Sequence, residues 1–263
     1  MALDWVTDLD DPRLEPYRNL RQTNHTRDKQ WVIAEGNWVV QRLLASRFTV
    51  ESVLLSERRI DGFRQYLHKD TNVLVVQDVL IREIIGFKFH SGVIACGHRP
   101  TNWQQPLVLD TDSHELIVCC PYITLPDNLG SIVRLSAGLG ATSLLLGARC
   151  ADPFSRRVVR VSMGNIFFFP VRVIETLHAH IAQLRQHHGF RIIAATLQAP
   201  CIPLKSSHRA SRMVLLLGNE AHGLDEEWYE LADERVTIPM VEPIDSLNVA
   251  DAAAIMLYHY CQG

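Results

Sequence analysis

Polar residues that could carry chemistry gather in the second half of the chain, and the first group runs from Asn128 to Arg134. It combines an amide and a guanidinium, which are strong hydrogen-bonding groups, around Gly130, which lets another backbone approach closely. Arg134 falls at least one turn into a predicted helix, beside apolar residues. Taken alone, the same pattern also suits a surface arginine on an amphipathic helix with Asn128 as its cap.

Three further groups stand at the ends of predicted strands or at the start of the last helix. An apolar strand runs straight into Gly-Asn-Glu-x-x-Gly at 218–223, a second ends at Ile238-Pro239-Met240, and Ser246-Leu247-Asn248 opens the final helix. Glycines at such a junction have no side chain, so a bound molecule can approach the backbone closely. These positions indicate a ligand-facing edge, and turn and capping chemistry explains each segment equally well when it is taken singly.

Alternating strands and helices must position these groups. The hydrophobic pattern predicts an α/β fold with a mostly parallel second sheet, and ligands bind outside the carboxyl ends of such strands. In the first part of the chain we expect helices at 36–47, 61–69 and from Asp78, and strands at 50–55, 72–76 and 92–97. In the second part we expect strands at 115–120, 142–147, 167–173, 191–196 and 213–218, a loop at 121–130, and helices at 131–139, 155–163, 175–188 and from Leu247 to about Tyr260.

Charge separates the chain into two parts. Residues 12–106 hold 14 Lys and Arg against 9 Asp and Glu, a balance of +5, whereas residues 107–263 hold 12 against 16, a balance of −4. A segment rich in turn-forming residues at 97–113 is predicted to be the linker between these two parts. The prediction is two domains, 1–106 and 107–263, of which the basic first one is the candidate to meet a polyanion such as nucleic acid.

Composition excludes several classes of protein. With 47% hydrophobic and 21% charged residues in 263, the chain is neither disordered nor fibrous. We expect a cytoplasmic protein, because no apolar run approaches the ~18–20 residues of a membrane span and the acidic start is no secretory signal. The six cysteines and the scattered histidines do not have the spacing of metal ligands, so no metal is expected. Cys119 and Cys120 lie in an apolar run, where we expect their thiols to pack as small hydrophobic groups.

The joint order of the motifs is more specific than any one of them. Asn-x-Gly-x-x-x-Arg, then Gly-Asn-Glu-x-x-Gly, then Ile-Pro-Met and Ser-Leu-Asn-Val-Ala resemble the SpoU (TrmH-like) family of RNA 2′-O-ribose methyltransferases, within the SPOUT superfamily. The resemblance spans about 114–260 and includes the Ala-Asp-Pro-Phe-Ser-Arg-Arg segment from Ala151. Residues 27–96 look like the small, ribosomal-protein-like RNA-binding domain that many members carry in front. One departure is Val241-Glu-Pro-Ile-Asp245, where many relatives have a glycine-containing loop.

The resemblance implies a C-terminal trefoil knot, a homodimer and S-adenosylmethionine as the methyl donor. It places Arg134 at the step in which the ribose hydroxyl loses its proton, either as the base or as a clamp on RNA phosphate, because a guanidinium seldom gives up its proton. Asn128, Glu220, Ser246 and Asn248 would orient that arginine or the ribose. The residues it implies around the donor are Thr196, Leu197, Leu217, Gly218, Ile238, Met240, Leu247 and Asn248.

The resemblance leaves the RNA open. Arg156, Arg157 and Arg160 are candidates to grip RNA phosphates, and a solvated helix face explains them equally well. A separate basic domain suits a large structured target, which favours ribosomal RNA over transfer RNA. The alternative to an enzyme is a non-catalytic RNA-docking and dimerisation protein.

Overall fold

The computed structural model describes residues 3–18, 20, 23–86, 90–103, 114–241 and 246–262. Most of the predicted linker, with the predicted domain boundary at 106/107, lies outside these residues, as do residues 242–245 of the segment in which the sequence departs from the family pattern. By internal packing the chain divides into two units: Met1–Thr101 with Pro153–Phe168, and Asn102–Asp152 with Phe169–Gly263. The segment Pro153–Phe168, which the sequence pattern placed in the second domain, is grouped by packing with the first unit, and the domain boundaries themselves stay a prediction.

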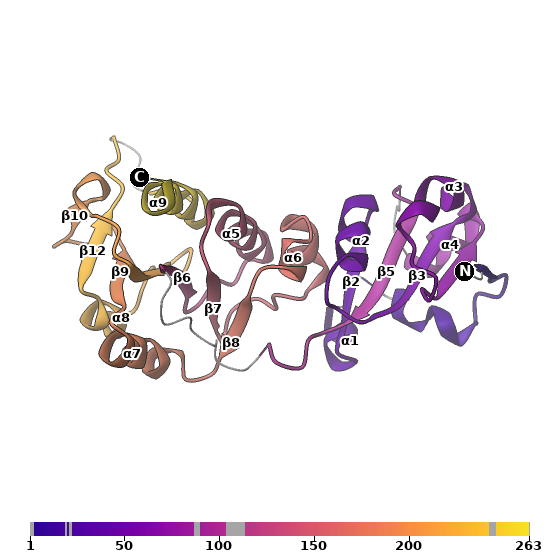
Figure 1. Cartoon of the computed structure of the whole chain (residues 1–263), viewed down its shortest axis with the longest axis horizontal. Helices are drawn as coiled ribbons and strands as arrows, with labels where there is room; N and C mark the ends of the chain where they lie inside the picture. The colour runs from indigo at the N-terminus through magenta and orange to yellow at the C-terminus, as the bar shows by residue number, and fades with distance from the viewer. Residues whose placement is uncertain are drawn as a thin grey trace. The chain divides into compact units, whose positions relative to one another are not determined.

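The first unit is built on a mixed five-stranded sheet (Figure 1), in the order β1-β4-β3-β5-β2. β1, β4 and β3 run parallel, while β5 pairs antiparallel with β3 and β2. The strands are β1 (Leu3–Trp5), β2 (Trp31–Glu35), β3 (Val50–Ser56), β4 (Val73–Val76) and β5 (Val93–His98). The α-helices are α1 (Thr23–Asp28), α2 (Asn37–Leu44), α3 (Ile60–Phe63), α4 (Asp78–Ile85) and α6 (Arg156–Val161), with 3-10 turns at Pro12–Tyr17, Glu57–Arg59, Arg64–Tyr66 and Asn165–Phe167.

The second unit is a fully parallel seven-stranded sheet, in the order β10-β12-β9-β11-β6-β7-β8. Figure 1 shows α5 and α9 on one side of this sheet and α7 and α8 on the other. The strands are β6 (Glu115–Cys120), β7 (Ser143–Gly147), β8 (Val171–Ile174), β9 (Arg191–Ala195), β10 (Ile202–Pro203), β11 (Arg212–Leu216) and β12 (Glu234–Thr237). The helices are α5 (Pro126–Leu139), α7 (Leu177–His188), α8 (Glu226–Leu231) and α9 (Val249–Gln262), with a 3-10 turn at Leu204–Ser206.

Two inner strands of this sheet, β6 and β7, are buried along their whole length, which explains their largely apolar sequences. Every residue of β6 and β7 is buried. A parallel sheet covered by helices on both faces needs such strands, because neither face meets water. Burial also raises the pKa values of the Cys119 and Cys120 thiols well above their usual range, so both stay protonated and pack as small apolar groups.

The α/β class is confirmed, and several element boundaries differ from the predicted ones. Pro126 occupies the first turn of α5, where its fixed φ favours the helix, so that helix begins within the predicted loop 121–130. The predicted helix 61–69 is a short α-helix between two 3-10 turns, and the predicted strand 167–173 begins only at Val171. The pattern also missed short elements among the described residues, namely β1, β2, β10, α1 and α8.

Neither a membrane-spanning helix nor a metal site is visible in the described part of the chain. None of its helices is both long and apolar enough to cross a bilayer. None of its His, Cys, Asp and Glu side chains form a group of three or more suited to a metal ion.

Candidate functional site

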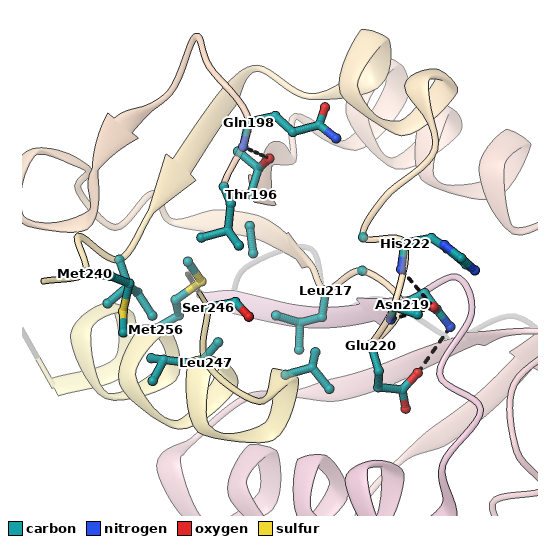
Figure 2. Close-up of a pocket in the computed structure, with 18 of the residues that line it drawn as sticks. Thr196, Gln198, Leu217, Asn219, Glu220, His222, Met240, Ser246, Leu247 and Met256 are labelled. Atoms are coloured by element: carbon teal, nitrogen blue, oxygen red, sulfur yellow. Dashed lines mark hydrogen bonds between the residues drawn. The ribbon is translucent and has the colours of Figure 1, made fainter. Parts of the chain in front are cut away.

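A cavity of about 310 Å³ opens in the second unit at the carboxyl ends of β9, β11 and β12, beside the start of α9 (Figure 2). Its volume falls at the lower end of the range for small-molecule sites. Seven of the residues expected around the donor line it, together with Ser246: Thr196, Leu197, Leu217, Gly218, Ile238, Met240 and Leu247. Asn248, the eighth, does not line the cavity and instead binds the neighbouring polar network.

The walls of the cavity combine apolar side chains with backbone and a few polar groups. Figure 2 shows Leu217, Met240, Leu247 and Met256 around the space, with Thr196 above it. The Thr196 hydroxyl lies 2.9 Å from the hydroxyl of Tyr229 and also accepts a hydrogen bond from the backbone N–H of Gln198, at 2.9 Å. Apolar walls with a few fixed polar groups suit a purine nucleoside carrying an amino-acid tail, so these residues fit S-adenosylmethionine.

The loop between β11 and α8 needs its glycines to keep its shape. Asn219 and Gly223 pair across it, with N···O distances of 2.7 and 3.0 Å. A Cβ on Gly218 would lie 2.5 Å from the carbonyl carbon of Gly223, and Gly223 itself has a φ of +72°. Both glycines are therefore required by the fold of the loop, which is the physical reason for the Gly-Asn-Glu-x-x-Gly pattern.

A chain of hydrogen bonds joins three of the five residues predicted to be catalytic. Asn248 Nδ2 donates to Asn128 Oδ1 at 3.0 Å, and Asn128 Nδ2 donates to Glu220 Oε1 at 3.1 Å. Asn248 also caps α9, because its Oδ1 accepts from the backbone N–H of Ala250 at 2.8 Å. The network therefore ties the starts of α5 and α9 to the loop after β11.

The Glu220 carboxylate stands at the positive end of α5. Its oxygens accept the backbone N–H groups of Thr124 and Leu125, at 3.3 and 3.1 Å, where α5 has no side-chain cap of its own. Burial by itself would raise the pKa of Glu220. The hydrogen bonds from its own backbone N–H, from Asn128 and from residues 124–125 outweigh burial and lower that pKa, so Glu220 is ionised at neutral pH.

Asn128 does not cap α5 as expected, because the helix begins at Pro126 and Asn128 lies buried inside its first turn. Arg134 lies farther along α5 and is exposed. It makes no hydrogen bond or ion pair with any residue in the described ranges, and it is not among the residues that line the cavity. Its guanidinium is therefore open to a partner from outside the described chain.

The predicted RNA-gripping arginines lie in the first unit, on α6. Arg156 Nη1 is bound to Glu35 Oε2 at 2.8 Å, which ties α6 to the end of β2. Arg157 and Arg160 are exposed. The three predicted arginines thus belong to the first unit, and the residues that line the cavity belong to the second.

The sequence pattern did not predict several of the residues that line the cavity. Gln198, His222, Tyr229, Val249, Ala252 and Met256 also line the cavity. Tyr229 sits in a short helix that the pattern did not predict, so nothing indicated which way it faces. Met256 falls two turns into α9, on the same face as the buried residues Ala253 and Leu257, and helical spacing from Val249 could have suggested it.

Comparison with known proteins gives consistent matches. The family model described as "SpoU rRNA Methylase family" matches residues 115–258. An uncharacterized tRNA/rRNA methyltransferase of Mycobacterium bovis is 36% identical over 96% of this chain and 90% of that protein. A 23S rRNA guanosine 2′-O-methyltransferase of Bacillus subtilis is 32% identical over 51% of this chain and 53% of its own. The crystal structure of an AdoMet-bound rRNA methyltransferase from Sinorhizobium meliloti superposes with a TM-score of 0.85, at 26% identity, over 99% of this chain and 98% of that one.

Proposed function

This chain belongs to the SpoU rRNA methylase family, and we propose that it transfers a methyl group from S-adenosylmethionine to a ribose 2′-hydroxyl of ribosomal RNA. The family makes it an RNA 2′-O-methyltransferase that uses S-adenosylmethionine. The observation that carries the proposal is the cavity at the strand ends, bordered by the Asn248–Asn128–Glu220 network. The choice of ribosomal RNA is supported by the relatives named as 23S rRNA enzymes and by the separate basic part of the chain.

The donor binds in the cavity, where it supplies an electrophilic methyl group. The apolar side chains of Leu217, Ile238, Met240 and Leu247 enclose it, while backbone groups at Gly218 and the polar residue Thr196 orient it. Leu197 contacts the donor only at the rim of the cavity, since it is 59% exposed. Holding both reactants in place supplies much of the rate gain in such a transfer.

Arg134 acts on the RNA as a phosphate clamp rather than as the base. Its guanidinium is exposed and has no partner among the described residues, and guanidinium groups in general do not serve as bases in proteins. By neutralising a phosphate next to the attacking ribose, this cation lowers the pKa of the 2′-hydroxyl and stabilises the charge that develops on its oxygen; the proton passes to solvent water and S-adenosylhomocysteine leaves. This clamp role is the part of the mechanism that substitution tests most directly.

Glu220, Asn128 and Asn248 position the site. A carboxylate with a lowered pKa is a weak base at neutral pH, so Glu220 serves as an acceptor that fixes the Asn128 amide and residues 124–125. Ser246 is exposed at the cavity wall and directs its hydroxyl toward the donor or the ribose. These residues are therefore positioning groups around the arginine and the methyl donor.

The first unit binds the RNA. Its exposed groups include Trp38, which is 69% exposed, and Arg157 and Arg160 of α6. An exposed aromatic ring suits stacking on unpaired bases, and exposed arginines suit contacts with phosphate. The domain is expected to be of the small ribosomal-protein type.

A trefoil knot and a homodimer complete the proposal. The order of the second sheet supports the knot, because the chain leaves β11 at the centre, passes β9 to form β12 and then returns to pack α9 against α5. The dimer is supported by three exposed apolar side chains at the start of α5 and on α9: Leu125 at 53%, Ile255 at 42% and Tyr258 at 64%.

The test is a transfer assay with tritium-labelled S-adenosylmethionine and total RNA from a strain that lacks the gene, followed by sizing of the labelled RNA. Label in ribosomal RNA, resistant to alkali at one dinucleotide, is the expected result. Label in transfer RNA would keep the chemistry and overturn the substrate. Protein that binds the donor but labels no RNA would contradict the proposal.

A further inference from the structure

A second cavity, of about 200 Å³, opens in the second unit beside the cofactor cavity. The two cavities share Asn219, His222 and Gly223, so the loop at 218–223 borders both. The remaining lining residues of the second cavity include Tyr122 and Arg149. None of the residues expected to bind the donor faces this space.

The second cavity is built by the ends of three adjacent strands. Tyr122 follows β6, Arg149 follows β7 and Asn219 follows β11, and β11, β6 and β7 are neighbours in the sheet. Asn219 Nδ2 donates to the backbone carbonyl of Tyr122 at 3.0 Å, which holds the first and third loops together. Ala151 N donates to the carbonyl of Ile123 at 2.8 Å and holds the first and second. The position is thus the usual place for a ligand in an α/β fold.

The lining groups suit a flat, polar-edged ring. The Arg149 guanidinium carbon lies 4.6 Å from the centroid of the Tyr122 ring. Arg149 is exposed and forms no ion pair with a described carboxylate. Asp225 and the His222 imidazole offer hydrogen-bonding groups, and the His222 side chain points away from the interior of the cofactor cavity in Figure 2. Proteins bind unpaired RNA bases in this way, with a ring or guanidinium plane for stacking and polar groups for the base edge.

The place of this cavity relative to the reacting groups decides which base it would take. Tyr122 is two residues before Thr124, whose hydroxyl donates to Glu220 Oε2 at 3.3 Å. Asn219 Nδ2 also donates to that oxygen, at 3.1 Å. The second cavity therefore adjoins the network that borders the methyl donor, and a base held there belongs to the methylated nucleotide or its neighbour.

We infer that this second cavity binds an unpaired base of the substrate RNA next to the ribose that is methylated, stacked on Tyr122 and Arg149. The inference rests on the proposed function. A phosphate alone would need the arginine and not the ring, so the Tyr122 side chain is the feature that distinguishes a base from a phosphate here. The bond from Asn219 ends on the Tyr122 main chain, so substituting the ring leaves that bond in place.

The test compares Tyr122→Ala, Tyr122→Phe and Arg149→Ala, with Lys205→Ala as a control that removes an exposed charge lining neither cavity. The RNA is total RNA from a strain lacking the gene. The KM for RNA, kcat and filter binding of the RNA are measured, with donor affinity by calorimetry. Tyr122→Ala is expected to raise the KM and the dissociation constant for RNA about 5- to 100-fold, the usual effect of losing one stacked base.

The Tyr122→Phe variant keeps the aromatic ring, so it distinguishes the loss of base stacking from a structural change in the loop. Tyr122→Phe is expected to stay close to the wild type, and all four variants are expected to keep the donor affinity. Wild-type RNA affinity in Tyr122→Ala would overturn the inference, as would a loss confined to Arg149→Ala, which would mark a phosphate site. If the wild type transfers no methyl group, the proposed function fails, and filter binding by the same variants still decides whether the cavity holds a base.

Discussion

The two units of the chain use their polar residues in different ways. In the second unit, Asn128, Glu220 and Asn248 are part of one continuous network, in which their amide and carboxylate groups bind one another. In the first unit, by contrast, the Trp38 ring is 69% exposed and the Arg160 side chain is exposed as well. A site that holds a small donor needs rigid, mutually fixed groups, whereas a surface that meets RNA keeps its rings and cations available.

This difference separates two kinds of substitution. Changes in the network or at Arg134 are expected to act on the transfer step, and changes in the first unit on the affinity for RNA. The kinetic constants distinguish the two, because an interaction made only in the transition state lowers kcat while uniform binding affects KM.

The largest effect is expected from Arg134→Ala. Loss of the clamp removes charge stabilisation at the attacking oxygen, and removal of one such group typically costs about 10²- to 10³-fold in kcat. Because Arg134 is exposed and has no partner among the described residues, the melting temperature and donor affinity are expected to stay at the wild-type values. Transfer rates under saturating RNA and donor check this, and a wild-type kcat would contradict the clamp.

Glu220→Gln is expected to lower both the rate and the stability. The change removes the negative charge at the start of α5 and weakens its hydrogen bonds to residues 124–125, at a cost of about 1–2 kcal/mol in the free energy of unfolding. Urea unfolding measures that cost. Glu220→Asp, which keeps the charge on a shorter side chain, is the matched control, and a Glu220→Gln protein as stable as the wild type would contradict the capping role.

The stability difference made by Glu220→Gln is expected to depend on pH. The pKa of Glu220 is lowered on folding, so the carboxylate contributes its full stability above the pKa of the unfolded chain. That contribution is lost as the pH falls through the lowered pKa of the folded state. Urea unfolding measures the difference in free energy of unfolding between the wild type and Glu220→Gln, and this difference is expected to be smaller in acid than at neutral pH. A difference that does not change with pH would show that the charge of Glu220 does not stabilise the loop.

Trp38→Ala is expected to weaken RNA binding without slowing the transfer step. Loss of one stacked base raises the KM for RNA about 5- to 100-fold, while kcat and donor affinity stay unchanged. Trp38→Phe keeps a ring and is expected to recover most of the affinity. A fall in kcat in Trp38→Ala, with no change in KM, would contradict the assignment of RNA binding to the first unit and of methyl transfer to the second.

The smallest effect is expected from Arg160→Gln. Removing one phosphate contact weakens RNA binding for all sequences and reduces the slope of log affinity against log salt by about 1. Filter binding at several salt concentrations measures that slope. A salt dependence equal to that of the wild type would show that Arg160 meets only solvent.

The sequence predicted the cavity better than it predicted the geometry around it. Thr196, Leu217, Gly218, Met240 and Leu247 lie in motifs at strand ends, and parallel strands bring their carboxyl ends to one edge, so the residues meet. Their binding of the donor stays a prediction. The Gly-Asn-Glu-x-x-Gly motif was informative because Gly218 and Gly223 have a steric reason to be glycine.

Long-range pairings were beyond the sequence. Nothing in the local pattern shows that Glu220 caps a helix that begins at Pro126, 94 positions earlier in the printed chain. The placement of α6 with the first unit depends on contacts such as the Arg156–Glu35 ion pair, which joins segments 121 residues apart. The boundary of α5 was misjudged because Pro126 was taken as part of a loop rather than as the first residue of a helix.

Methyl transfer to a ribose oxygen of ribosomal RNA, with Arg134 as the clamp, is tested by mass spectrometry of nucleosides. RNA that lacks the modification is treated with wild-type protein or with Arg134→Ala. We expect a 2′-O-methylated nucleoside from ribosomal RNA with the wild type and almost none with the variant. A methyl group on a base, or full ribose methylation by Arg134→Ala, would contradict this expectation.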